Sequence, residues 1–164
     1  MNSKLNPVEL TQELIRFNTI NPPGNEDLIC DYLKSLLESA GYECRKIEFA
    51  PRRASLVAKI GACSQSKPSI CFTGHVDVVP LGARTWSFEP FAGVINDGKL
   101  YGRGSSDMKS GVAAFVVAAI QMAEQAKQGA GVSMIITAGE ETGCEGAFHL
   151  AASQEIVDFL GPAG

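Results

Sequence analysis

The sequence has few of the residues on which several functional classes depend. Among its 164 residues are two histidines and five cysteines, and the cysteines are widely scattered without a CxxC pair. An odd, scattered set of cysteines favours neither a disulfide framework nor a thiolate zinc site. We therefore expect reduced thiols and a cytoplasmic location.

Long apolar runs and an excess of positive charge are also missing. No stretch approaches the ~20 apolar residues that cross a bilayer, and the N-terminus has no apolar signal-peptide core. The 14 Lys and Arg residues against 18 Asp and Glu residues give a net charge of −4, which would repel a polyphosphate. The sequence thus predicts no nucleic-acid partner and no membrane partner.

The composition is that of a globular domain, with 45% hydrophobic and 20% charged residues. Apolar spacing predicts helices over residues 7–17, 25–40 (capped by Asn25), 110–123 and 145–152, and strands over 42–49, 55–60, 69–73 and 132–137. The first two strands are predicted near an edge. The last two are apolar without alternation, as interior strands are. This order predicts an α/β layered domain with a central, mostly parallel or mixed sheet flanked by helices.

Three polar clusters lie at the ends of these predicted elements. The first is Thr73-Gly74-His75-Val76-Asp77, where extended geometry places His75 and Asp77 on the same side of the chain. A carboxylate so placed can accept one imidazole N–H and leave the other nitrogen free for a metal. Taken alone, the pattern favours a histidine that is hydrogen-bonded within a turn.

The second cluster is the glycine-rich segment 97–111. Asp97-Gly98 predicts a hairpin turn, and Asp107 precedes the helix expected to begin near Ser110. Asp107 taken alone fits a helix cap as well as it fits a ligand. Neither phosphate-loop pattern is present, which argues against nucleotide binding.

The third cluster, Gly139-Glu140-Glu141-Thr142-Gly143, directly follows the predicted strand over 132–137. Adjacent carboxylates there repel each other unless they face solvent or a cation offsets the charge. Open α/β sheets bind ligands at the edge where such segments gather. One imidazole with several carboxylates predicts a site for divalent ions such as paired zinc, cobalt or manganese.

Together, the runs 72–80, 97–111 and 139–143 closely resemble the M20 family of metallo-amidohydrolases. They occur in that family's order and spacing over roughly residues 5–160. The resemblance implies a zinc-exopeptidase-like fold, two zinc ions, and a homodimer as the full-length protein.

The resemblance also implies a role for each candidate residue. His75 would ligate one zinc ion, Asp107 would bridge both ions, and Glu141 would ligate the second. Glu140 would be the general base, and Asp77 would orient His75. A cis peptide bond would follow Asp107.

Several parts of the family pattern are missing from this length of chain. Members carry a further acidic ligand, a last histidine and an inserted dimerisation domain, whereas His149 falls in a predicted helix and is expected to be a surface or packing residue. Residues 1–164 are therefore expected to be the N-terminal part of a catalytic domain, incomplete at its C-terminus. As a fragment, the chain is expected to be inactive and to contain little tightly bound zinc.

The implied activity is cleavage of the amide bond of an N-acyl amino acid, of the acetylornithine deacetylase or succinyl-diaminopimelate desuccinylase type. A water bridging two zinc ions would lose its proton to Glu140 and attack the carbonyl carbon. The alternatives are an M20 dipeptidase or carboxypeptidase acting on a short peptide, and a non-catalytic domain with an incomplete metal site.

Overall fold

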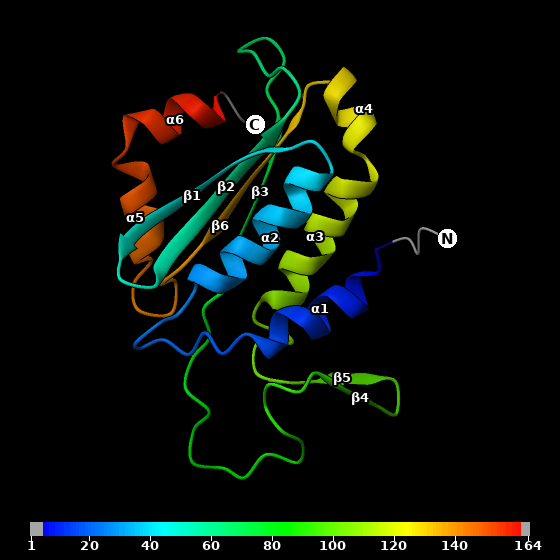
Figure 1. Ribbon diagram of the computed structural model, residues 1–164, viewed down its shortest axis with the longest axis vertical. Helices are drawn as coiled ribbons and strands as arrows, with labels where there is room; N and C mark the ends of the chain where they lie inside the picture. Colours follow the sequence, from blue (N-terminus) through cyan, green and yellow to red (C-terminus); the bar gives the residue numbers. More distant parts are fainter. Residues whose placement is uncertain (1–4, 162–164) are drawn as a thin grey trace.

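A sheet between two layers of helices forms the body of the computed structural model, which describes residues 5–161 (Figure 1). The helices are α1 (Pro7–Arg16), α2 (Asp27–Ser39), α3 (Lys109–Gln121), α4 (Ala123–Gln128), α5 (Glu145–Ala151) and α6 (Gln154–Leu160). The strands are β1 (Glu43–Ala50), β2 (Arg53–Ile60), β3 (Ile70–His75), β4 (Val94–Asn96), β5 (Lys99–Tyr101) and β6 (Val132–Thr137). In this part of the chain, no helix is long and apolar enough to span a bilayer.

The main sheet has the strand order β1-β2-β6-β3 and is mixed. β1 pairs antiparallel with β2, β2 pairs antiparallel with β6, and only β3 and β6 run parallel. The α/β class is therefore confirmed, and of the two sheet types that were predicted the mixed one is present. The parallel pair matters for the site, because both strands end at the same edge of the sheet.

Side chains of β2 alternate between two hydrophobic cores, one on each face of the sheet. Leu56 and Ala58 are buried with α1, α2 and α3, whereas Val57 is buried with Leu150 and Phe159 of the α5–α6 layer. Figure 1 shows α2 and α3 on one face and α5 and α6 on the other. Each face is thus covered by its own set of helices.

The predicted positions of two strands in the sheet were wrong. β2 was predicted near an edge but lies in the centre, and the run over 69–73 was predicted inside the sheet but forms β3, which among residues 5–161 pairs only with β6. At the start of β3, Ile70 is 62% exposed. The apolar run over 69–73 therefore predicted correctly neither the burial of its faces nor the number of strands beside it.

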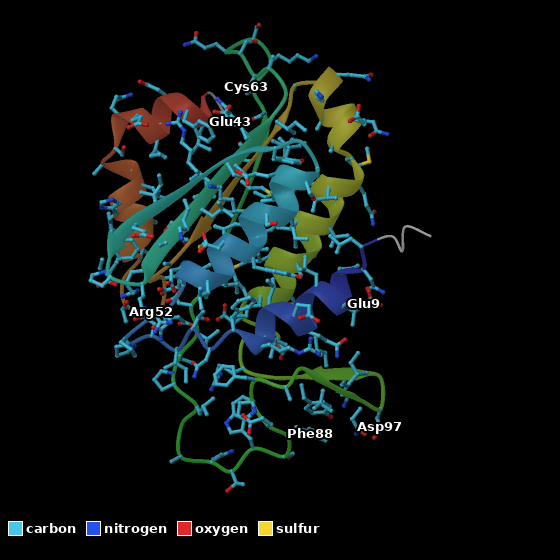
Figure 2. All side chains as sticks on the ribbon, viewed as in Figure 1. Glu9, Glu43, Arg52, Cys63, Phe88 and Asp97 are labelled. Atoms are coloured by element: carbon cyan, nitrogen blue, oxygen red, sulfur yellow. The ribbon has the colours of Figure 1, made fainter. Side chains whose placement is uncertain are left out.

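The local predictions had mixed outcomes. The hairpin at Asp97-Gly98 is confirmed as the turn between β4 and β5, and both residues have positive φ (49° and 72°). Figure 2 shows Asp97 at the tip of this hairpin. The Asn25 cap was wrong: α2 begins after Glu26, with no side-chain cap. Helices α4 and α6 were not predicted.

Glu26, which directly precedes α2, is buried in an ion pair with Arg53. Its carboxylate accepts a hydrogen bond from Arg53 Nε at 2.8 Å, and this ion pair joins the start of α2 to β2. The Glu26 side chain is 0% exposed, so the buried charge is compensated by the guanidinium. The five cysteines are all free, as expected.

Candidate metal centre

His75 is the last residue of β3, and its two ring nitrogens have different surroundings. Nδ1 lies 3.1 Å from the backbone oxygen of Asp77 and 3.4 Å from its carboxylate. Nε2 lies 3.1 Å from Asp107 Oδ1 and 3.7 Å from Glu140 Oε2. When Nδ1 donates its proton to Asp77, Nε2 presents a lone pair to the acidic side of the site.

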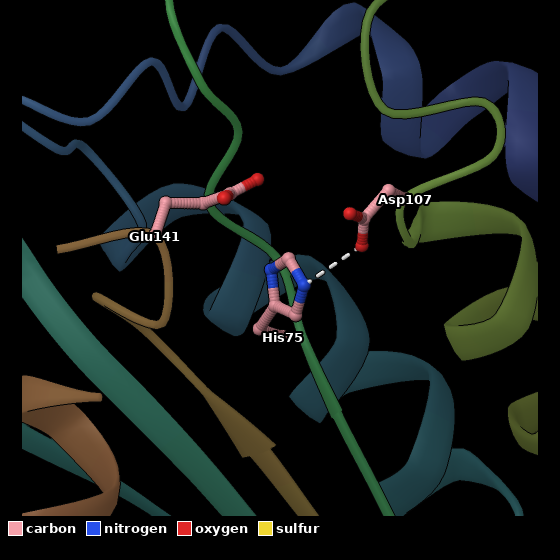
Figure 3. Close-up of side chains that lie close together, drawn as sticks. All are labelled: His75, Asp107 and Glu141. Carbon is pink, nitrogen blue, oxygen red and sulfur yellow. Dashed lines mark hydrogen bonds and ion pairs between the residues drawn. The ribbon is translucent and has the colours of Figure 1, made fainter. Parts of the chain in front are cut away.

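Asp107 lies in the backbone just before α3. The peptide bond between Asp107 and Met108 is cis, as the resemblance implied. The helix begins after Met108 and has no side-chain cap, so Asp107 does not cap it. The Asp107 side chain is 76% exposed and points toward His75 (Figure 3). Its carboxylate is therefore available to a ligand.

Glu140 and Glu141 follow β6, which pairs in parallel with β3. Because His75 lies opposite Thr137 in that pairing, the residues after β6 arrive beside the imidazole. The backbone N–H groups of Glu140 and Glu141 each donate to the Asp77 carboxylate at 3.1 Å. The buried carboxylate of Asp77 thus positions both His75 and the backbone of the two glutamates.

Three candidate ligands come together at this edge of the sheet. One donor atom each from His75, Asp107 and Glu141 lies within 4.8 Å of the other two (Figure 3). Nitrogen and oxygen ligands on one tetrahedral zinc ion lie roughly 3.4 Å apart, so the acidic side chains would have to move closer together to hold one ion. The donor set of one imidazole and two carboxylates suits zinc, cobalt or manganese. The residues fit a divalent ion.

Protonation of the site follows from this crowding of charge. Burial lowers the pKa of His75, but hydrogen bonds and charge from Asp77 outweigh burial and raise that pKa to about 9. Burial raises the pKa of Asp77, yet the hydrogen bonds from His75, Asn21 and the backbone hold it below its ordinary value. The pKa of Glu141 is raised by burial, opposed by His75, and raised further by Asp107. A cation at this place would relieve the repulsion among the acids.

Two buried polar residues beside the site were missed in the sequence. Asn21 donates from Nδ2 to Asp77 Oδ2 at 2.9 Å, and it lies in the segment that was treated only as a break between helices. Lys109 is 0% exposed and donates from Nζ to the Phe17 backbone oxygen at 2.7 Å. Burial lowers the pKa of Lys109 to about 7, against the opposing charge of Asp77. Neither role has a signal in local sequence, because both depend on distant partners.

Comparison with known proteins gives one family. The family model for peptidase family M20/M25/M40 matches residues 71–161, more than half of the chain. A succinyl-diaminopimelate desuccinylase of Wolbachia pipientis wMel is 41% identical over 141 residues, covering 85% of this chain and 34% of that protein. One from Rhodospirillum centenum is 36% identical over 163 residues, covering 96% of this chain and 40% of that protein. The chain therefore spans little more than a third of the length of these relatives.

Solved structures share the fold at lower identity. An M20 family metallo-carboxypeptidase from Sulfolobus solfataricus has a TM-score of 0.79 and 21% identity, covering 99% of this chain and 36% of that one. Human carnosine dipeptidase 1 has a TM-score of 0.77 and 23% identity, covering 95% of this chain and 36% of that one. At this identity, the likeness establishes the fold.

Proposed function

Because the chain belongs to peptidase family M20/M25/M40, a family of hydrolases, we propose that it supplies the metal centre of an enzyme that cleaves the amide bond of N-acyl amino acids. The observation that carries the proposal is the convergence of His75, Asp107 and Glu141 beside the carboxylate of Glu140. The desuccinylase relatives favour a succinylated amino acid over a peptide as the substrate.

We assign the ligands as the geometry suggests. His75 Nε2 and the carboxylates of Asp107 and Glu141 would hold the metal, and Asp107 would be shared between two ions. Two zinc ions are proposed, with cobalt or manganese as alternatives. When bound, such ions polarise an amide carbonyl and lower the pKa of a water molecule toward 7.

Glu140 is the proposed general base. Its carboxylate is 45% exposed and lies 3.7 Å from His75 Nε2, so it borders the metal site and remains open to substrate and water. It would take a proton from the attacking water and return it to the departing amine. Asp77 would keep His75 in the tautomer that leaves Nε2 unprotonated.

We further infer that residues 1–164 are the N-terminal part of the catalytic domain of a longer protein. Within the described residues, the outer edge of β3 has no neighbouring strand, and an apolar groove flanks it on each face of the sheet. The groove beside Ile70, Phe72 and Met122 has a volume of about 360 Å³. The groove beside Thr73 and Val157 has a volume of about 260 Å³. Polypeptide of the kind present in the longer relatives would cover this edge of β3. The complete enzyme is proposed to be a cytoplasmic homodimer.

The experiment is an assay of the natural reading frame that contains these residues, on a panel of N-acetyl and N-succinyl amino acids with added zinc. We expect release of free amine that is lost in Glu140→Gln, by about 10²-fold to 10⁴-fold in kcat. Zinc content should be unchanged in that variant. Hydrolysis that persists in Glu140→Gln would remove the residue from its proposed role.

A further inference from the structure

The segment between α1 and α2 lies against all three polar clusters. The Val78 N–H donates to the Thr19 backbone oxygen at 3.0 Å, and the Asn21 N–H donates to the Val78 backbone oxygen at 2.9 Å. At the start of the segment, the backbone oxygen of Phe17 accepts the hydrogen bond from Lys109. The backbone at Asn21 is therefore fixed to the chain that carries Asp77.

From this fixed backbone, the side chain of Asn21 joins two clusters. Its Nδ2 donates to Asp77 Oδ2 at 2.9 Å and to Thr142 Oγ1 at 2.8 Å. Asn21 is 2% exposed and Asp77 is 0% exposed. The amide thus supplies, inside the protein, the donors that water supplies to an exposed carboxylate.

The position of Asp77 decides the position of its neighbours. Its carboxylate also accepts from the backbone N–H groups of Glu140 and Glu141 and lies beside His75 Nδ1. Asn21 holds this carboxylate from the segment between α1 and α2. Its second hydrogen bond, to Thr142, holds the turn over residues 140–142 directly. Removing the Asn21 amide therefore removes the hydrogen bonds to Asp77 and to Thr142 together.

We propose that Asn21 is a positioning residue of the metal centre, which holds Asp77 against the turn over residues 140–142 so that His75 and Glu141 face one cation. The proposal rests on the proposed function, in which those two side chains ligate a metal. Asn21 acts through Asp77 and Thr142, and it ligates nothing itself.

Thr19 provides a matched control for a purely structural role. It lies in the same segment, is 0% exposed, and donates from its hydroxyl to the Val76 backbone oxygen at 2.6 Å. Its side chain makes no hydrogen bond to a side chain of the site. Thr19→Val therefore removes a buried hydrogen bond of this segment and leaves the Asp77 carboxylate with all its donors.

The first measurement is the affinity of the 164-residue chain for Zn²⁺ by titration calorimetry, with the visible absorption of bound Co²⁺ as a spectroscopic probe of ligand geometry. Asn21→Ala should weaken zinc binding by about 10-fold to 100-fold and alter the Co²⁺ spectrum. Asn21→Asp keeps the shape but sets a second carboxylate against Asp77, so it should weaken binding at least as much. The zinc affinity of Thr19→Val should stay within about three-fold of wild type, because the hydrogen bonds to the Asp77 carboxylate are intact.

The second measurement needs no metal. Amide hydrogen exchange in the metal-free chain should be about five-fold faster at Glu140 and Glu141 in Asn21→Ala, relative to Ile135 in β6, since a lost hydrogen bond of ~1 kcal/mol has that effect. Thr19→Val should leave this ratio unchanged. The Glu140 and Glu141 amides are the ones that donate to Asp77.

The outcomes separate the two ideas. Zinc affinity of Asn21→Ala equal to wild type, restored affinity in Asn21→Asp, or unchanged exchange at Glu140 and Glu141 would each overturn the positioning role while the proposed function stands. If the natural reading frame that contains these residues binds neither Zn²⁺ nor Co²⁺, the proposed function fails and a metal-positioning role fails with it. If only the 164-residue chain binds neither ion, the exchange measurement decides: faster exchange in Asn21→Ala supports the positioning role, and unchanged exchange refutes it.

Discussion

The centre of the sheet and its carboxyl edge are stabilised by different interactions. At the centre, β2 places Leu56 and Ala58, both 0% exposed, against apolar side chains of the helices. At the edge, the Asp77 carboxylate is surrounded by hydrogen-bond donors and by further acids. The centre should therefore respond to loss of volume, whereas the edge should respond to pH and to metal.

The largest effect is expected at the centre. Leu56→Ala should lower the free energy of unfolding by about 3 kcal/mol, because it removes buried methyl groups and leaves a cavity. Leu28→Ala in α2 is the control, since Leu28 is 54% exposed, and it should cost less than about 0.5 kcal/mol. Urea unfolding measures both. Equal losses would mean that the β2 core contributes no more than the surface does.

Metal should stabilise the edge and leave the packing of the centre as it is. Zinc at 100 times its dissociation constant should raise the free energy of unfolding by about 2.7 kcal/mol, and chelation should reverse the gain. Asp107→Ala should remove most of this gain, because it deletes one of the three candidate ligands. Leu56→Ala should keep the full gain. A zinc effect that survives Asp107→Ala would place the ion elsewhere.

The buried lysine predicts a dependence of stability on pH. Since burial lowers the pKa of Lys109 to about 7, the unfolded chain binds more protons than the folded chain between that pH and its ordinary pKa of 10.5. Lys109 should therefore make stability rise with pH in this window, by about 2 kcal/mol between pH 7.5 and 9, whereas His75, whose pKa is raised to about 9, makes stability fall over the same window. The difference in unfolding free energy between metal-free wild type and Lys109→Met isolates the lysine and should rise by about 2 kcal/mol between the two pH values. A difference that is the same at both pH values would contradict the prediction.

The smallest effect on stability is expected at Glu140. Its side chain is 45% exposed, so Glu140→Gln should change the free energy of unfolding by less than about 0.5 kcal/mol. It should change zinc affinity little, while turnover by the complete enzyme is lost. A large loss of stability in this variant would make Glu140 part of the framework that holds the edge.

The same contrast explains what the sequence could predict. The main strands and the larger helices were predicted because apolar spacing is a local property, and the hairpin because Asp97-Gly98 favours positive φ. The order of strands in the sheet is set by distant pairing, so the exchange of β2 and β3 between centre and edge had no local signal. Composition predicted neither the neighbours nor the burial of these strands correctly, because β2 is buried along most of its length and the start of β3 is exposed.

The candidate site was predictable to the extent that residue type and position carry the chemistry. His75, Asp107 and Glu141 follow strands or precede a helix, and the structure brings them together. Asn21 was missed because an asparagine before two prolines is typical of any loop. Its contacts to Asp77 and Thr142 span 56 and 121 residues of sequence, which no local pattern encodes.

The convergence of three distant side chains on one ion is tested most directly by anomalous diffraction at the zinc edge, on crystals of the chain grown with Zn²⁺. A peak about 2.0 to 2.2 Å from His75 Nε2 and from carboxylate oxygens of Asp107 and Glu141 is the predicted result. A well-ordered edge with these side chains apart, and zinc bound only at other residues, would contradict it.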